Sequence, residues 1–148
     1  MYIKKISWDE IYPIWKDYLW KNRKTAIKPT NGMLLSGEYD KDVEMNNPTF
    51  FGAFSNEELI GVNSGFATSD KEYRSRGIYV SKMWRKKGVA QLLFEAVEDQ
   101  AIKEGKKILW SIPRESALSA YQNFGFEVLS QCTADMEFGP NYYVMKRL

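Results

Sequence analysis

The sequence predicts a mixed α/β domain, and three observations support this prediction. Runs rich in β-branched and aromatic residues predict three consecutive strands, over 49–54, 59–67 and 73–80. Apolar residues then recur at helical spacing from Val89 to Ala101. A short apolar strand at 107–112 follows, which completes a strand–helix–strand crossover.

The N-terminal part of the chain predicts a strand followed by a helix. Residues 2–6 read as a short strand, and Ser7 with Glu10 has the spacing of a capping box, which marks a helix start. Residues 11–19 place apolar side chains at i, i+3, i+4, i+7 and i+8, on one helix face. Because proline has no backbone N–H, we expect Pro13 to kink this helix or shift its start.

The segment between this helix and the central strands predicts little regular structure. Residues 33–35 predict a short second helix, and residues 40–48 predict a loop. Turn residues at 55–58 and 69–71 separate the three central strands, so we expect these strands to form an antiparallel meander.

The C-terminal part predicts one more helix between short strands. Gly105 is a natural stop for the long helix. A helix is expected over 116–124, with strands over 126–131 and 142–145. We therefore expect residues 1–148 to form a single domain.

The composition excludes several functional classes. The 148 residues include no histidine and one cysteine, which excludes a Ser-His-Asp triad, a His-ligated zinc site and an intrachain disulfide. The 21 Lys+Arg and 19 Asp+Glu give a net charge of +2, which makes nucleic acid an unlikely main partner. The chain has no long apolar run and no signal-peptide core, so we expect a cytoplasmic protein that does not engage a membrane.

The segment 78–91 carries the pattern of a phosphate site. A strand ends at Val80, a basic loop follows, and an amphipathic helix opens at Val89. Free N–H groups and the dipole at a helix N-terminus attract anions, and Gly88 has no Cβ to keep a phosphate from the backbone. The loop adds three positive charges, on Arg85, Lys86 and Lys87. The P-loop and G-x-G-x-x-G patterns are both absent from the sequence.

This segment resembles the acetyl-CoA signature of the GNAT superfamily of N-acetyltransferases. The family pattern is Gln/Arg-x-x-Gly-x-Gly/Ala after an apolar-Tyr-Val strand end, and here it reads Arg85-Lys86-Lys87-Gly88-Val89-Ala90 after Ile78-Tyr79-Val80. A second hallmark, Ala-x-x-x-Tyr-x-x-x-Gly-Phe, matches residues 117–126 with Tyr121 as its tyrosine. The order of elements also agrees, so the resemblance spans essentially the whole chain.

The resemblance implies a fold and an activity. The fold is a mostly antiparallel seven-stranded sheet, splayed between strands 4 and 5 and flanked by about four helices. The activity is transfer of the acetyl group of acetyl-CoA, without a metal, to a primary amine of a small molecule or peptide by direct attack in a ternary complex. The residues implied to bind acetyl-CoA are Ile78, Tyr79, Val80, Arg85, Lys86, Lys87, Gly88, Val89, Ala90 and Gln91.

Two residues are candidates for proton transfer. The resemblance implies that Tyr121 donates a proton to the departing thiolate, as a phenol with a pKa near ~10 can. The absence of histidine leaves a carboxylate or ordered water to deprotonate the amine. Glu72, at the start of the strand that leads to Val80, is the first candidate for this base, and Asp70 and Glu115 are lesser ones.

Arg74 and Arg76 allow two interpretations. Strand alternation places Glu72, both arginines and Ile78 on one face, unless a bulge interrupts it. The guanidinium groups either grip an acidic group on the acceptor or form salt bridges across the meander. Arg114 stands where many family members have asparagine, which leaves one usual cofactor contact open.

Two other functions stay open at this point. A non-catalytic sensor would bind acetyl-CoA but release no CoA with any amine. A nucleic-acid or phosphoprotein docking surface, made of the basic loop with Arg74 and Arg76, would bind in a strongly salt-dependent way. The sequence also leaves open the acceptor, the acyl chain length and the oligomeric state, for which a homodimer is one option.

Overall fold

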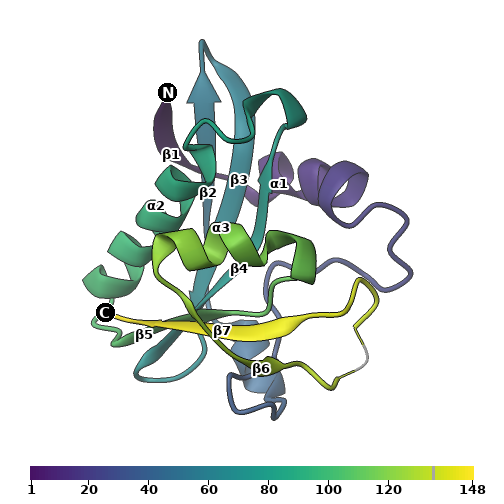
Figure 1. The fold of residues 1–148 in the computed structure, drawn as a ribbon, viewed down its shortest axis with the longest axis vertical. Helices are drawn as coiled ribbons and strands as arrows, with labels where there is room; N and C mark the ends of the chain where they lie inside the picture. The colour runs from purple at the N-terminus through teal and green to yellow at the C-terminus, as the bar shows by residue number, and fades with distance from the viewer. Residues whose placement is uncertain (135) are drawn as a thin grey trace.

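The computed structural model describes residues 1–134 and 136–148, and they form one seven-stranded mixed sheet with helices on both faces (Figure 1). The spatial order of the strands is β1-β2-β3-β4-β5-β7-β6. The strands are β1 (Tyr2–Ile6), β2 (Thr49–Ser55), β3 (Glu58–Ala67), β4 (Glu72–Val80), β5 (Ile108–Ser111), β6 (Glu127–Gln131) and β7 (Tyr142–Arg147). The α-helices are α1 (Trp8–Ile14), α2 (Val89–Lys103) and α3 (Leu118–Phe124). None of the helices in these ranges is long and apolar enough to cross a membrane.

The topology confirms the predicted fold class. All pairs of neighbouring strands are antiparallel except β4 and β5, which are parallel and joined by the α2 crossover. The meander of β2, β3 and β4 is also confirmed. A turn at Asn56 and Glu57, both with positive φ, connects its first two strands.

The N-terminal helix begins as predicted and ends in an unexpected way. Ser7 and Glu10 form the capping box, because each side chain accepts a hydrogen bond from the backbone N–H of the other residue. Pro13 lies inside α1 without ending the helical path. The path instead widens into a π-helical turn at Trp15–Leu19. This turn buries Trp15 completely against the sheet.

The prediction of a second helix at 33–35 is wrong, and so is the prediction of a loop over 40–48. Leu34 accepts a hydrogen bond from the N–H of Gly37, and Met33 pairs with Tyr39, so this segment is a turn between two bridging residues. The short helix lies later, as a 3-10 helix at Lys41–Met45. The side chain of Asp40 caps it, a polar signal that apolar periodicity does not report.

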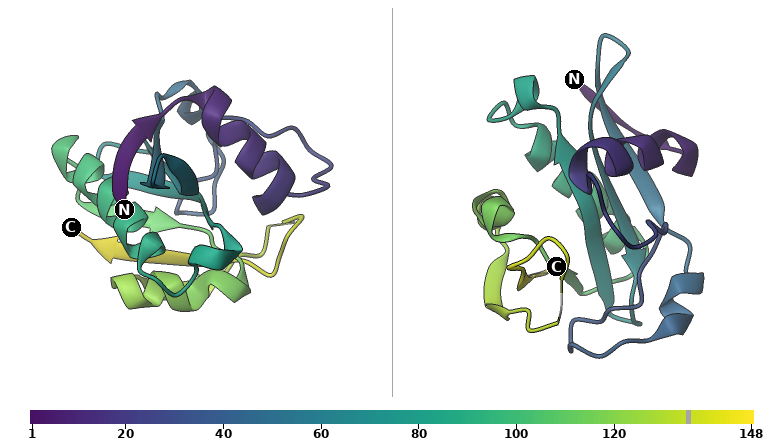
Figure 2. Two further views of the ribbon diagram at one scale, coloured as in Figure 1. Left: turned by 90° about the horizontal axis from the view of Figure 1, so that it is seen from above. Right: turned by 90° about the vertical axis from the view of Figure 1, so that its right-hand side faces the viewer.

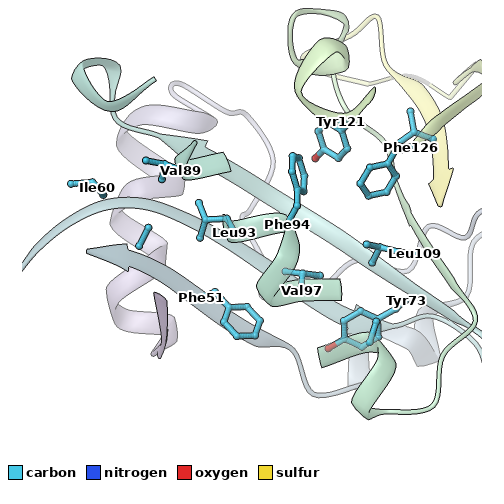
Figure 3. Packing of buried hydrophobic residues seen from close by; sticks show 13 residues of the cluster. Phe51, Ile60, Tyr73, Val89, Leu93, Phe94, Val97, Leu109, Tyr121 and Phe126 are labelled. Atoms are coloured by element: carbon cyan, nitrogen blue, oxygen red, sulfur yellow. The ribbon is translucent and has the colours of Figure 1, made fainter. Parts of the chain in front are cut away.

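The two faces of the sheet carry different elements (Figure 2). Helices α2 and α3 pack on one face of the sheet. The core cluster on this face includes Phe94, Tyr121, Phe126, Tyr73 and Leu109 (Figure 3). On the other face, α1 and the π-helical turn pack against the sheet through a second core cluster, made of Ile11, Trp15, Phe50 and Val62.

A bulge at Gly77 reverses the alternation of β4. Arg76 pairs with Ser64 and Tyr79 pairs with Val62, so two residues of β4 oppose one residue of β3. Gly77 has a φ of +84°, and its carbonyl accepts a hydrogen bond of 2.8 Å from the Trp15 indole N–H. The expectation that Ile78 shares a face with Arg74 and Arg76 is therefore wrong. Ile78 packs with the α2 side instead.

The predicted splay between strands 4 and 5 is confirmed. The two strands pair only from Glu72 to Arg74. At the next position the hydroxyl of Ser111 donates to the carbonyl of Ser75 at 2.6 Å, in place of a backbone bond. Pro113 follows, and because proline has no N–H it cannot extend the pairing.

We predict that Gly77→Ala destabilises the protein far more than Gly105→Ala. Both glycines have a φ near +80°, but a Cβ on Gly77 would lie 2.4 Å from the Trp15 ring, whereas a Cβ on Gly105 meets nothing within 4 Å. We expect Gly77→Ala to lower the free energy of unfolding by about 3 kcal/mol, because backbone strain and overpacking add up. For Gly105→Ala we expect a decrease of about 1 kcal/mol, from backbone strain alone. Urea denaturation measures both values, and equal losses would contradict the packing of Trp15 on the bulge.

Candidate functional site

A pocket of about 730 Å³ opens where β4 leaves β5. Its walls come from the end of β4, the loop after it, the start of α2, the segment leading into α3, and the π-helical turn. The structure brings most of the predicted cofactor residues together as pocket lining: Ile78, Tyr79, Val80, Arg85, Lys86, Gly88, Val89, Ala90 and Gln91. Lys87 is not among the lining residues, and its ammonium lies 5.4 Å from the centre of the Trp84 ring.

The N-terminus of α2 presents free backbone donors to this pocket. Gly88 precedes the helix with a φ of +85°, and no side chain caps the first turn. Because the first N–H groups of a helix have no partner within it, they stay available to an anion. The first turn contains no acidic residue, so no negative side chain there neutralises the partial positive charge at the helix N-terminus. A Cβ on Gly88 would have no neighbour within 4 Å, so the space in front of it is open.

The loop before α2 folds back on the strand. The Nε of Arg85 donates to the Val80 carbonyl at 3.0 Å, and the guanidinium lies 5.5 Å from the centre of the Tyr79 ring. Beyond Arg74 this edge of β4 has lost its β5 neighbour, so its backbone groups face the pocket instead of a strand. The arrangement can pair with an extended ligand on β4 and hold a phosphate at the start of α2.

Tyr121 lies at the inner end of the pocket. Its side chain is buried between α3 and the sheet, with its ring centroid 4.6 Å from that of Phe94. Its hydroxyl is 3.3 Å from the hydroxyl of Ser111, which in turn bonds the Ser75 carbonyl at the point where the strands part. Burial raises the pKa of Tyr121 above its usual value, and it therefore keeps its proton at neutral pH.

Arg114 joins the two sides of the pocket. It lines the cavity, and its guanidinium donates to the Leu19 carbonyl of the π-helical turn at 2.9 Å. The same guanidinium lies 5.1 Å from the centre of the Phe138 ring. The residue that departs from the family pattern thus ties the α1 side of the molecule to the β5 side.

The structure does not bring Glu72 into the pocket. Glu72 lies where β4 and β5 are still paired, and its carboxylate accepts a hydrogen bond of 2.8 Å from the Ser69 hydroxyl. Glu115 is occupied with the Tyr142 hydroxyl at 3.1 Å. Within the described part of the chain, no Asp or Glu lines the pocket, and no three His, Cys, Asp or Glu side chains gather as metal ligands.

Several lining residues escaped the sequence reasoning. Those on and before α3 include Ser116, Ser119, Ala120 and Asn123, whose spacing of i, i+3, i+4 and i+7 marks one helix face and was available in the sequence. Those on the π-helical turn had no such signal, because the widened turn shifts which side chains face the sheet. The lining residues of both kinds, with Trp84 from the loop after β4, are Tyr18, Leu19, Trp84, Ser116, Ala117, Ser119, Ala120 and Asn123.

Comparison with known proteins adds a family and a fold. Residues 8–126 match the Acetyltransferase (GNAT) family, and no curated protein matches the sequence. Ard1 from Thermoplasma volcanium has a similar structure, with a TM-score of 0.72 at 16% identity over 99% of this chain and 97% of that one. An acetyltransferase of the GNAT family from Staphylococcus aureus has a TM-score of 0.68 at 13% identity, over 99% of this chain and 98% of that one. PaiA N-acetyltransferase from Thermoplasma acidophilum was solved in complex with coenzyme A. It has a TM-score of 0.60 at 20% identity, over 69% of this chain and 62% of that one.

We predict that Ser111 and Tyr121 are energetically coupled. Ser111→Ala removes the donor to the buried Ser75 carbonyl and is expected to cost roughly 1–3 kcal/mol of folding free energy. In a double-mutant cycle with Tyr121→Phe, we expect a coupling of about 1 kcal/mol, since the two hydroxyls are in contact. Urea denaturation of the four proteins measures this coupling. Strictly additive losses would show that the two hydroxyls act independently.

Proposed function

The chain belongs to the GNAT acetyltransferase family, and from this premise we propose that it transfers the acetyl group of acetyl-CoA to a primary amine. The observation that carries the proposal is one pocket that joins an uncapped helix N-terminus to a buried tyrosine hydroxyl. An acyl-CoA needs both features, a site for its pyrophosphate and a proton donor at its thioester. The coenzyme A bound to the Thermoplasma acidophilum relative supports the choice of ligand.

Each part of the ligand has a proposed contact. The backbone N–H groups from Gly88 to Gln91 hold the pyrophosphate, and Arg85 and Lys86 add positive charge beside them. The pantetheine arm pairs with the free edge of β4 over residues 78–80, as an added strand would. Lys87 points to the Trp84 ring and contributes only to the local charge.

The proposed chemistry is direct attack of the amine on the thioester carbonyl carbon. The C–N bond forms and the C–S bond breaks, and the thiolate leaves with the electron pair of that bond. Tyr121 donates its proton to this thiolate, and its raised pKa ensures that the proton is present. A backbone N–H near Val80 polarises the carbonyl oxygen as charge develops on it.

Removal of the amine proton is assigned to water. No carboxylate of the described residues lines the pocket, and Glu72 is held by Ser69 where the strands are still paired. A protonated amine of pKa near ~10 carries a small neutral fraction at pH 7, and this fraction rises with pH. The rate is therefore expected to increase with pH until the amine is neutral.

The two alternative functions differ in their support. Arg74 and Arg76 are only 6% and 5% exposed, so they offer no surface to a nucleic acid or a phosphoprotein. The sensor alternative uses the same pocket and makes a different prediction, which is acetyl-CoA binding without CoA release in the presence of any amine.

We predict that Tyr121→Phe lowers kcat by about 100-fold or more, the contribution typical of a general acid. Its dissociation constant for acetyl-CoA is expected to stay within about threefold, because the pyrophosphate and pantetheine contacts lie elsewhere. CoA-thiol release over a panel of amino acids, polyamines, aminoglycosides and peptides measures turnover, and calorimetry measures binding. Unchanged turnover removes Tyr121 from the mechanism. Binding without thiol release from the whole panel favours the sensor.

We also predict that Glu72→Gln leaves the pH–rate profile unchanged, because this carboxylate lies outside the pocket. The matched control is Glu58→Gln at the far end of the meander, which removes the same charge from an exposed position. An acidic limb that disappears in Glu72→Gln but not in Glu58→Gln would restore Glu72 as the general base.

A further inference from the structure

Two buried arginines on β4 have no counter-ion among residues 1–134 and 136–148. Arg74 and Arg76 lie on the α1 side of the strand and are 6% and 5% exposed. The ion pairs within the described residues join Lys28 to Glu44 and Lys146 to Glu98, so neither arginine belongs to one. The interpretation that they form salt bridges across the meander is therefore wrong.

Their present partners are neutral. One amino group of Arg76 donates to the Lys28 carbonyl at 2.9 Å, and its guanidinium lies 4.8 Å from the centre of the Trp20 ring and 5.3 Å from that of Trp15. Arg74 donates to the Asn31 side-chain carbonyl at 3.4 Å, and its guanidinium lies 5.3 Å from the centre of the Trp110 ring. Its Nε–H is buried and finds no hydrogen-bond partner among the described residues.

This arrangement is costly for the protein alone. Burial lowers the pKa of Arg74 to about 10, and burial together with the neighbouring Arg74 lowers the pKa of Arg76 well below its usual value. A third cation, Arg23, lies over the Trp20 ring and adds repulsion. Burial lowers the pKa of Arg23 more than the negative charge of the Glu137 carboxylate raises it. Indole rings offset part of the cost of a buried cation, but a buried charge without a counter-ion still destabilises the fold.

The cluster lies beside the proton donor. Arg74 and Arg114 both lower the pKa of Tyr121, although burial outweighs them. Arg74 also immediately precedes Ser75, whose carbonyl is linked through Ser111 to the Tyr121 hydroxyl. Arg74 therefore lies at the point where β4 parts from β5, on the face of the sheet opposite α2.

We propose that Arg74 and Arg76 bind a carboxylate of the amine acceptor, so that the substrate is an amino acid or another small amine that carries a carboxylate. This inference rests on the proposed acetyl transfer and names its acceptor class. Each guanidinium lies over an indole ring, and the N–H groups of a guanidinium form a planar fork that binds a carboxylate in a bidentate way. The ligand oxygens would supply the missing partner of the Arg74 Nε–H.

The test compares amino acids with their carboxamides, which keep the amine and lose the charge. With α- and ω-amino acids and the matching amides, we expect the best acid to have a kcat/KM at least about tenfold above that of its amide, as for a charge-assisted hydrogen bond. Arg74→Lys and Arg76→Lys keep the charge and lose the fork, and each is expected to reduce kcat/KM for the acid by about tenfold or more while changing that for the amide by less than about threefold. Arg147→Gln, at an exposed position on β7, is the control and is expected to change neither.

A second measurement does not depend on turnover. At constant ionic strength, sodium propionate is expected to raise the melting temperature of the wild type more than propionamide does, and this difference is expected to vanish in Arg74→Lys but not in Arg147→Gln. Equal kcat/KM for acids and amides, or no specific effect of propionate, overturns the carboxylate site and leaves acetyl transfer intact. A propionate effect without thiol release from any amine supports the site and contradicts the proposed transfer.

Discussion

The parting of β4 from β5 after Arg74 is the constraint on which the rest of the molecule depends. When a parallel pair separates inside a protein, the N–H and C=O groups of the opened edge need new partners. Side chains from three different elements take carbonyls along the opened strand: Ser111 bonds Ser75, Trp15 bonds Gly77, and Arg85 bonds Val80. The opened edge is thus held by tertiary contacts from both faces of the sheet. These contacts stabilise the separation of the two strands and therefore the pocket between them.

The same parting organises the chemistry on both faces. On the α2 face it places an uncapped helix N-terminus and the Tyr121 hydroxyl in one cavity. On the α1 face Arg74 and Arg76 are directed toward tryptophan rings, and no carboxylate of the described residues forms an ion pair with either. Proteins keep such unfavourable charges where a function needs them, and stability supplied elsewhere in the fold compensates. The two large core clusters, one on each face, provide that stability here.

The sequence predicted the features that are encoded locally. The capping box at Ser7, the helix from Val89 and the loop with Gly88 each depend on a few consecutive residues, and each lies where it was expected. The error about the face of Ile78 has a long-range cause. The face of Ile78 depends on the bulge at Gly77, which Trp15 stabilises from 62 residues away in the chain.

The candidate site shows the same division. The loop and strand end before α2 were predicted because the family motif is contiguous, whereas the walls from the π-helical turn and from Arg114 come from distant segments. Glu72 was chosen for its position in the sequence, and only the pairing of β4 with β5 shows that it precedes the opened stretch. Arg74 is buried without an ion pair to any described carboxylate, and this likewise depends on which segments cover β4, a point on which composition carries no information.

Hydrogen exchange with and without acetyl-CoA tests most directly the claim that the splay is the acyl-CoA site. The amides of Ile78, Val80 and residues 88–91 face the proposed ligand, whereas that of Tyr79 faces β3. Acetyl-CoA is therefore expected to slow the exchange of the first group at least about tenfold. The amides of β1 and β6, at the two edges of the sheet, are expected to stay unchanged. Protection confined to another part of the chain, with none at 78–80 or 88–91 under saturating acetyl-CoA, would contradict the account.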